Sequence, residues 1–250
     1  MRNFHFPGRS PVMAPSAMVS TSHPLATLAG IDVLKSGGNA VDAAIAACAT
    51  LCVVEPAMTG IGGDCFVLYS PRNSSKPIAL NGSGKSPAAA NVANLRDRGI
   101  EQIEVETPHA VNVPGAISAW TRLNTDYGTK DLTELLQPAI NYAENGFPVA
   151  PRVALDWADN LPKLLGDEVS SKILTVSGAA PKAGTTFAQP LLGTTLAAIA
   201  KGGRDAFYTG EIAEDMVTRL NTLGGLHTLD DFASCVADYV EPISVSYKNH

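Results

Sequence analysis

The pattern of apolar positions is clearest between residues 39 and 54, where it predicts a helix. Apolar residues recur there at helical spacing, and alanine fills most of the remaining positions. Because no face of this helix is polar, we expect it to be buried, with a sheet as its neighbour. Asn39 is placed to cap its first amides, and Asp42 brings a negative charge to its positive end. The apolar positions are Val41, Ile45, Cys48 and Cys52.

The rest of the chain alternates between helical periods and short apolar strands. Proline or a capping residue begins several predicted helices, and glycine ends several of them. The predicted helices cover residues 22–35, 88–99, 114–128, 131–146 with a break at Pro138, 152–165, 189–200 and 211–220. A capped turn is predicted at 228–232, an antiparallel hairpin from strands 65–69 and 78–80, and a last strand at 239–247.

A cluster of glycines joins the predicted buried helix to the strand 65–69. We interpret Gly60, Gly62 and Gly63 as a structural turn at which two backbones approach closely. A dinucleotide-binding loop is the weaker interpretation, because its glycines follow a strand and open a helix. Here the order is helix, glycines, strand.

A second glycine-containing loop, residues 81–87, follows the predicted strand 78–80. Its exposed backbone amides are suited to hold a ligand. Gly84, Lys85 and Ser86 match the end of a phosphate-binding P-loop, but Ala79 occupies the place of the first glycine. A P-loop nucleotide-binding protein that uses Lys85 is therefore an alternative hypothesis.

Composition and charge restrict the class of protein. The 250 residues are 45% hydrophobic and 17% charged, which is ordinary for a globular chain. The net charge of −6 gives no basic surface for a nucleic acid or an anionic membrane, so we expect neither as a partner. Residues 1–17 read as a loose N-terminal arm, and no apolar run has the length of a signal peptide or a bilayer span. We therefore expect a cytoplasmic location.

Residues that commonly carry chemistry lie mostly in structural surroundings. The four cysteines occupy apolar runs, which is typical of reduced core thiols, and the five histidines lack the spacing of a metal site. Two threonine pairs, 185–186 and 194–195, are read as a helix cap and as mid-helix residues. We expect neither a metal nor a cofactor. The cysteines are Cys48, Cys52, Cys65 and Cys235.

Several short motifs, in this order along the chain, resemble the γ-glutamyltranspeptidase family. The resemblance runs from about residue 18 to residue 250 and matches the large-subunit part of the family's precursors, which is more specific than any single motif. The first motif is Leu-Lys-Ser-Gly-Gly-Asn-Ala-Val-Asp-Ala-Ala. The motifs occupy residues 34–44, 55–56, 60–63, 113–115, 136–139, 146–147, 207–210 and 224–226.

This resemblance implies an α+β fold of the Ntn-hydrolase type, an αββα sandwich of two stacked antiparallel sheets. Residues 18–250 would form a partial large-subunit domain, truncated before its sheet is complete. In the family, precursors cleave themselves before a threonine, which becomes the N-terminus of the small subunit. This threonine is the nucleophile, and its own amine acts as the base. That threonine would lie beyond this chain, so we expect no catalytic residue here. The implied partners are the small subunit and a γ-glutamyl or related acyl amide.

One departure from the family's pattern concerns the substrate. Transpeptidases carry an Arg-Glu pair that grips the substrate carboxylate, and here Ser83 and Gly84 occupy those places. This loop, with Asp64 after the double glycine, is more similar to the transpeptidase-related hydrolases and acylases. We name Ser83 and Lys85 as candidate substrate-binding residues, with Lys85 as the substitute cation. A noncatalytic relative and a homo-oligomer are alternatives left open.

Overall fold

The computed structural model of the chain describes residues 11–72, 74 and 76–248. Most of the predicted N-terminal arm lies outside the described residues, and the part from 11 to 17 forms neither helix nor strand. The helices are α1 (Pro24–Lys35), α2 (Ala40–Val54), α3 (Val92–Asp97), α4 (Ala116–Tyr127), α5 (Leu132–Leu135), α6 (Gln137–Asn145), α7 (Pro151–Leu165), α8 (Glu168–Leu174), α9 (Pro190–Tyr208), α10 (Glu211–Thr222) and α11 (Leu229–Ala233). The strands are β1 (Cys65–Tyr69), β2 (Ile78–Gly82), β3 (Phe147–Pro148), β4 (Thr186–Phe187) and β5 (Asp238–Val240).

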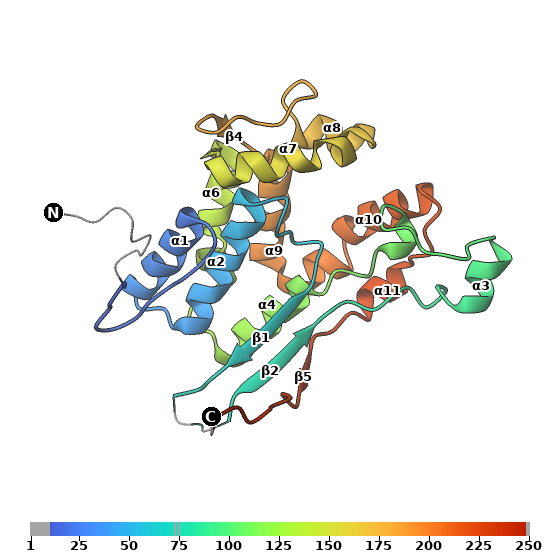
Figure 1. The fold of residues 1–250 in the computed structure, drawn as a ribbon. Coiled ribbons are helices and arrows are strands. Elements are labelled where there is room, and N and C mark those ends of the chain that lie inside the picture. The colour runs from blue at the N-terminus through green and yellow to red at the C-terminus, as the bar shows by residue number, and fades with distance from the viewer. Residues whose placement is uncertain (1–10, 73, 75, 249–250) are drawn as a thin grey trace.

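Three strands form an antiparallel sheet in the order β1-β2-β5, with helix α4 packed on one face (Figure 1). Val67 pairs with Leu80, and Leu80 pairs with Tyr239, so the predicted hairpin is confirmed. The continuous apolar run of β1 does not mean that both of its faces are covered. The side chains of Phe66 and Leu68 are 70% and 73% exposed, because the described helices cover only the opposite face.

The last strand is shorter than its sequence pattern predicts. β5 ends at Val240, and the segment to Tyr247 lies outside any strand, with Ile243 and Val245 exposed. Pro242 cannot donate a ladder hydrogen bond, and β2 pairs only with residues 238–240. Alternation of apolar residues therefore does not by itself extend a strand beyond its partner.

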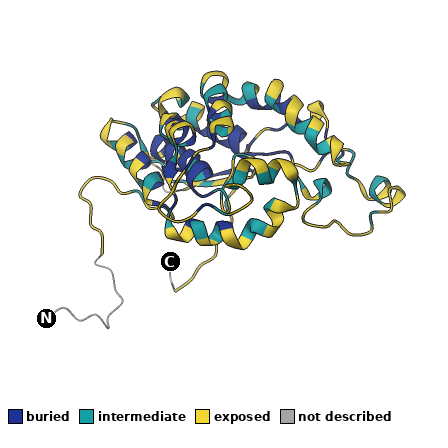
Figure 2. Cartoon of the chain, turned by 90° about the horizontal axis from the view of Figure 1, so that it is seen from above, coloured by how far each residue is buried: buried dark blue, intermediate teal, exposed yellow. Residues whose placement is uncertain are grey.

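Helix α2 is the most deeply buried helix-forming segment, as predicted, but its neighbours differ from those expected. It packs mainly against helices α1, α4, α5 and α6 instead of against the sheet. Its alanines let these helices approach on several sides, and Figure 2 shows the buried residues gathered in the middle of the helical body. The hydrophobic core thus lies between helices, with the sheet at its edge.

One helix start differs from the prediction and one predicted helix end is confirmed. α3 begins at Val92 with Asn91 as its cap, several residues after the predicted start. The predicted stop at the two glycines is present within α9, because Gly203 adopts the non-helical angles φ 59° and ψ −140°, and α9 therefore consists of two helices that meet at a kink. The predicted break of the helix 131–146 is confirmed, since α5 ends before Pro138 and α6 contains it.

A buried carboxylate connects the start of α2 to a distant loop. The side chain of Asp42 is completely buried and accepts hydrogen bonds from the Asn39 amide (2.8 Å), the Thr129 amide (3.0 Å) and the Thr129 hydroxyl (2.5 Å). Burial alone raises the pKa of this carboxyl, but its hydrogen bonds outweigh burial and lower the pKa below its ordinary value. The predicted cap by Asn39 is confirmed, and the structure adds that Asp42 completes a capping box, which joins α2 to the end of α4.

We expect Asp42→Ala to lower the free energy of unfolding by about 3 kcal/mol, because it leaves buried amides without an acceptor. The surface variant Asp32→Ala, on α1, is the control and should change the free energy of unfolding by less than about 0.5 kcal/mol. Denaturant unfolding at pH 7 measures both values.

A comparison of wild type with Asp42→Asn tests the ionisation of Asp42. Its folded pKa is lower than its unfolded pKa, so its stabilisation is present above about pH 4 and is lost as pH falls through the folded value. The difference between wild type and Asp42→Asn should therefore shrink at low pH. A difference that stays constant from pH 7 to pH 2 would contradict this assignment.

Candidate substrate-binding site

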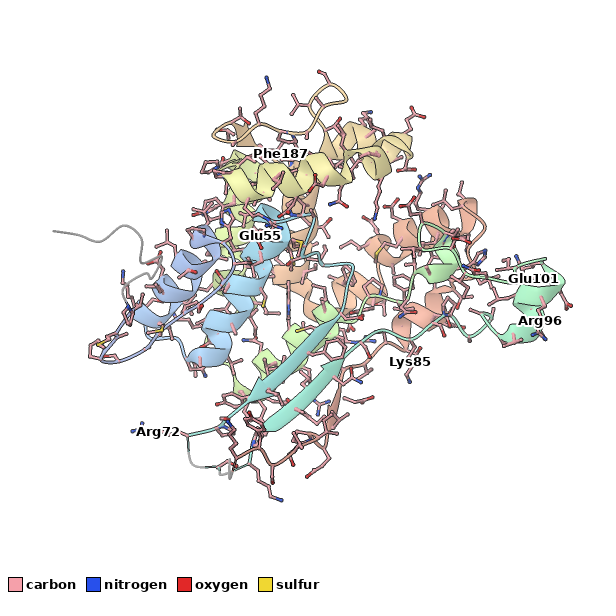
Figure 3. All side chains as sticks on the ribbon, viewed as in Figure 1. Glu55, Arg72, Lys85, Arg96, Glu101 and Phe187 are labelled. Carbon is pink, nitrogen blue, oxygen red and sulfur yellow. The ribbon has the colours of Figure 1, made fainter. Side chains whose placement is uncertain are left out.

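The candidate residues Ser83 and Lys85 lie on the loop 83–87 that leaves the end of β2. Ser83 is half-buried and Lys85 is exposed. In Figure 3 the Lys85 side chain lies where this loop passes close to α11. Among the described residues, its ammonium group has no ion-pair partner within 4 Å. The loop therefore presents an ammonium group at the surface without a direct ion pair.

Glycines allow the backbone of this loop to contact the segment before α4. A Cβ atom at Gly84 would lie 1.4 Å from the carbonyl oxygen of Val113, and one at Gly115 would lie 2.1 Å from that of Gly82. Real side chains cannot occupy such positions, so only glycine fits at both sites. The two backbones cross here at direct contact.

Backbone hydrogen bonds bring a third segment into this crossing. The amide of Val113 donates to the carbonyl of Lys85 at 3.0 Å, and the amides of Gly115 and Ala116 both donate to the carbonyl of Gly63 at 3.0 Å. The Gly63 carbonyl thus caps the first turn of α4, whose cap residue Gly115 has no side chain to do so. The segments 60–64, 82–86 and 113–116 form one unit, which we call the glycine crossing.

The glycine turn predicted at residues 60–63 is present, and its Gly63 carbonyl meets the backbone at the start of α4. This approach does not require glycine, because a Cβ atom at Gly60 or Gly62 would meet nothing within 4 Å, and one at Gly63 would make only ordinary contact. The Gly63 amide donates to the carbonyl of Gly60 at 3.3 Å, which closes the turn. The approaches that leave no room for a Cβ atom occur instead at Gly82, Gly84 and Gly115.

Two amides of the loop, those of Ser83 and Gly84, are not free to hold a ligand, which differs from the prediction. The Gly84 amide donates to Asp64 Oδ1 at 3.1 Å, and the Ser83 amide donates to Asn81 Oδ1 at 3.0 Å. A P-loop needs such amides for phosphate and needs a helix directly after its lysine. Here α3 begins only at Val92. The geometry therefore does not support the nucleotide-binding alternative for Lys85.

The far side of the loop is held by a residue that the sequence indicated only as a helix cap. Asp231 forms the predicted capping box of α11 with Thr228, and its second oxygen, Oδ1, accepts the amide of Ala88 at 2.9 Å. Ala88 follows Lys85 by three residues. The capping pattern identified Asp231, but no local signal could show its contact with a residue 143 positions away.

A buried polar group fixes the start of α4 to the chain that leads into β5. The Tyr208 hydroxyl donates to the carbonyl of Pro114 at 2.6 Å and accepts the Ser118 amide at 3.1 Å. The Ser118 hydroxyl in turn accepts the amide of Ala237 at 2.9 Å. Burial raises the pKa of Tyr208 well above its usual value, so this hydroxyl stays protonated. The glycine crossing thus rests on an ordered polar network.

The thiols behave as core residues, as predicted. All four cysteines are free, and burial raises the pKa of Cys52 to about 12 and that of Cys65 to about 11. Burial also raises the pKa of Cys235, while a hydrogen bond with Tyr208 and the positive charges of Arg204 and Lys85 act in the opposite direction. None of these thiols is therefore set up as a nucleophile.

The threonine pairs also have structural roles, although one differs from the prediction. Thr194 and Thr195 donate to carbonyls within α9, as expected for mid-helix residues. Thr186 lies in β4, and Gln189 occupies the cap position of α9, so the first pair does not cap this helix. Within the described part of the chain, no cluster of three or more His, Cys, Asp or Glu could hold a metal ion, and no helix could cross a membrane.

Comparisons with known proteins agree with this architecture. The family model described as γ-glutamyltranspeptidase matches residues 26–250. The glutathione hydrolase-like YwrD proenzyme of Bacillus subtilis is 37% identical over 240 residues, covering 96% of this chain and 45% of that protein. The oxamate amidohydrolase proenzyme of Klebsiella pneumoniae is 35% identical over 238 residues, covering 92% of this chain and 44% of that protein.

Solved structures show the same likeness. The γ-glutamyltranspeptidase of Helicobacter pylori matches with a TM-score of 0.89 and 31% identity, covering 96% of this chain and 70% of that chain. The cephalosporin acylase of Bacillus halodurans matches with a TM-score of 0.86 and 35% identity, covering 96% of this chain and 48% of that chain.

The chain belongs to the γ-glutamyltranspeptidase family of transferases and hydrolases, as the motifs predicted. Its mixture of helices and antiparallel strands is the Ntn-hydrolase fold of these γ-glutamyltranspeptidases and acylases. The chain spans less than half the length of the two proenzymes described above.

The glycine crossing predicts a sharp difference between two Gly→Ala variants. Gly84→Ala should lower the free energy of unfolding by about 3 kcal/mol or more, because its methyl group would overlap the Val113 carbonyl. Gly62→Ala adds the same methyl group in open space and should cost less than about 1 kcal/mol. Denaturant midpoints provide the comparison, and equal losses for the two variants would contradict the crossing.

Proposed function

We propose that this chain is the large-subunit part of an Ntn hydrolase that cleaves γ-glutamyl or related acyl amides. A threonine supplied by polypeptide beyond His250 attacks the amide carbonyl, the C–N bond breaks, and the amine leaves with the proton of the threonine hydroxyl, which gives an acyl-threonine intermediate. Water or an amino acid then takes the acyl group and returns a proton to the threonine oxygen. The observation that carries this proposal is the family match over residues 26–250, joined to the exposed cation of Lys85. This chain alone is inactive in our proposal.

The role of the described residues is to bind and orient. Lys85 pairs with a carboxylate of the substrate, and the adjacent Ser83 hydroxyl donates a hydrogen bond to it. The rigid glycine crossing holds both residues, so little backbone order has to be gained when substrate binds. A lysine is a point charge and does not reproduce the planar fork of an arginine. The orientation of the bound carboxylate is therefore less strictly fixed in our proposal than in an Arg-Glu transpeptidase.

The exposed apolar face of the sheet supports the proposed subunit partner. A surface hollow on this face is lined by Phe66 and Leu68 of β1, by Val240 of β5, and by Pro242 and Ile243. Apolar patches of this kind mark interaction surfaces. We propose that the small subunit of the same precursor covers this face and completes the sandwich.

Relatives indicate which substrates to test. The named relatives include glutathione hydrolases, an oxamate amidohydrolase and acylases. Because Ser83 and Gly84 replace the Arg-Glu pair, we propose a carboxylate-bearing amide as the substrate and do not restrict it to glutathione.

Lys85→Ala in the full-length precursor should raise the KM for a γ-glutamyl anilide by about tenfold or more, because it removes a charge-assisted contact worth about 1.5–3 kcal/mol. The kcat should change little, since the contact serves ground state and transition state alike. Lys76→Ala, at the opposite end of the β1-β2 hairpin, is the matched control and should leave KM unchanged. An unchanged KM for Lys85→Ala would remove Lys85 from the site.

Two further measurements separate the alternatives. Sequencing beyond His250 should reveal a threonine at a self-cleavage junction, and its absence would favour a noncatalytic relative. Titration with Mg-ATP should give no tight binding; tight binding abolished by Lys85→Ala would instead favour the nucleotide-binding alternative.

A further inference from the structure

Asp231 contacts two elements that are far apart in the sequence. Its Oδ2 accepts hydrogen bonds from the Thr228 amide (2.9 Å) and the Thr228 hydroxyl (2.7 Å), which closes the cap of α11. Its Oδ1 accepts the amide of Ala88 at 2.9 Å. One carboxylate therefore joins the start of α11 to the loop that carries Lys85.

These hydrogen bonds keep the carboxylate in its acceptor form. Burial alone raises the pKa of Asp231, but the hydrogen bonds from Ala88 and Thr228 act more strongly in the opposite direction and lower it. At neutral pH the group is ionised, and charge-assisted hydrogen bonds of this kind are stronger than neutral ones.

The helix that presents Asp231 is itself fixed on both sides. Before α11, the His227 ring nitrogen Nε2 lies 2.8 Å from the carbonyl of Val111, and the Asn221 side-chain amide donates to the His227 carbonyl at 3.1 Å. After α11, the Arg204 guanidinium donates to the carbonyl of Cys235. Asp231 thus projects from an anchored turn.

The loop is consequently held on both sides of Lys85. On one side, Asp64 accepts the Gly84 amide and the Val113 amide binds the Lys85 carbonyl. On the other side, Asp231 accepts the Ala88 amide, and the intervening Pro87 is buried. Without Asp231, the segment after Lys85 would lose its hydrogen bond to α11 and would keep only the packing of Pro87.

We propose that Asp231 is a positioning residue for substrate binding, which acts by fixing the backbone on the C-terminal side of Lys85. This inference rests on the proposed function, in which Lys85 binds the substrate carboxylate. Asp231 itself contacts loop backbone and the cap of α11, and the binding contact is made by Lys85. Its loss therefore adds the cost of ordering the loop to the cost of binding.

The test compares Asp231→Ala with Thr228→Ala in the full-length precursor. Thr228→Ala weakens the same cap of α11 but leaves the contact between Asp231 and Ala88. It therefore reproduces the loss of helix stability that Asp231→Ala causes, without the loss of the loop contact. Asp231→Ala should raise the KM for a γ-glutamyl anilide by about tenfold, with kcat within about twofold of wild type. Thr228→Ala should leave KM within about twofold of wild type.

Hydrogen exchange provides a second readout that does not depend on turnover. The peptide that contains residues 82–90 should lose protection in Asp231→Ala and keep it in Thr228→Ala. Unchanged protection in Asp231→Ala, or lost protection with an unchanged KM, would overturn the inference. Equal KM increases in both variants would also overturn it, because they would reflect the cap alone.

The two proposals fail in different ways. A wild-type precursor that hydrolyses no γ-glutamyl or acyl amide would overturn the proposed function, and this inference with it. An active precursor whose Asp231→Ala variant keeps the wild-type KM would overturn only the role of Asp231.

Discussion

The contact between backbones at Gly82, Gly84 and Gly115 is the constraint on which the candidate site depends. Peptide groups from two segments meet there with no side chain between them. The approach aligns the Val113 amide with the Lys85 carbonyl and the start of α4 with the Gly63 carbonyl. A loop held in this way needs few side chains of its own, so Ser83 and Lys85 are left available for a ligand. Rigidity comes from the backbone, and chemistry is left to the side chains.

The rest of the fold places this crossing at the border between helices and sheet. Helix α4 begins at the crossing, packs on the sheet and ends at the loop whose Thr129 binds Asp42. Asp42 in turn starts α2, the helix at the centre of the core. A continuous set of buried contacts therefore connects the main core to the candidate loop. The opposite face of the sheet carries exposed apolar side chains, where we place the proposed small subunit.

Much of the fold follows from local sequence. The helical period and capping residues predicted α2, α4, α7, α10 and the turn of α11, because helix formation is decided within a few neighbouring residues. The β1-β2 hairpin was also predictable from two apolar runs and a polar turn. The exposure of Phe66 was not predictable, since an apolar strand has the same pattern whether one or both faces are covered.

The site was predictable only in part, for a similar reason. Motifs indicated the family and drew attention to the loop of Lys85, but the pattern placed the close backbone approach at Gly60–Gly63, where a Cβ atom would meet little or nothing. A glycine in open space and a glycine in contact look the same in a sequence. Asp64 and Asp231 act on the loop across 20 and 143 residues, and only the folded chain brings them to it.

The most direct test of this account is a crystal structure of the mature enzyme with a slowly hydrolysed substrate analogue that carries a free carboxylate. The account predicts that the Lys85 ammonium group lies within about 4 Å of that carboxylate, with the backbone of the glycine crossing unchanged. A carboxylate bound elsewhere, with Lys85 directed into solvent, would contradict it.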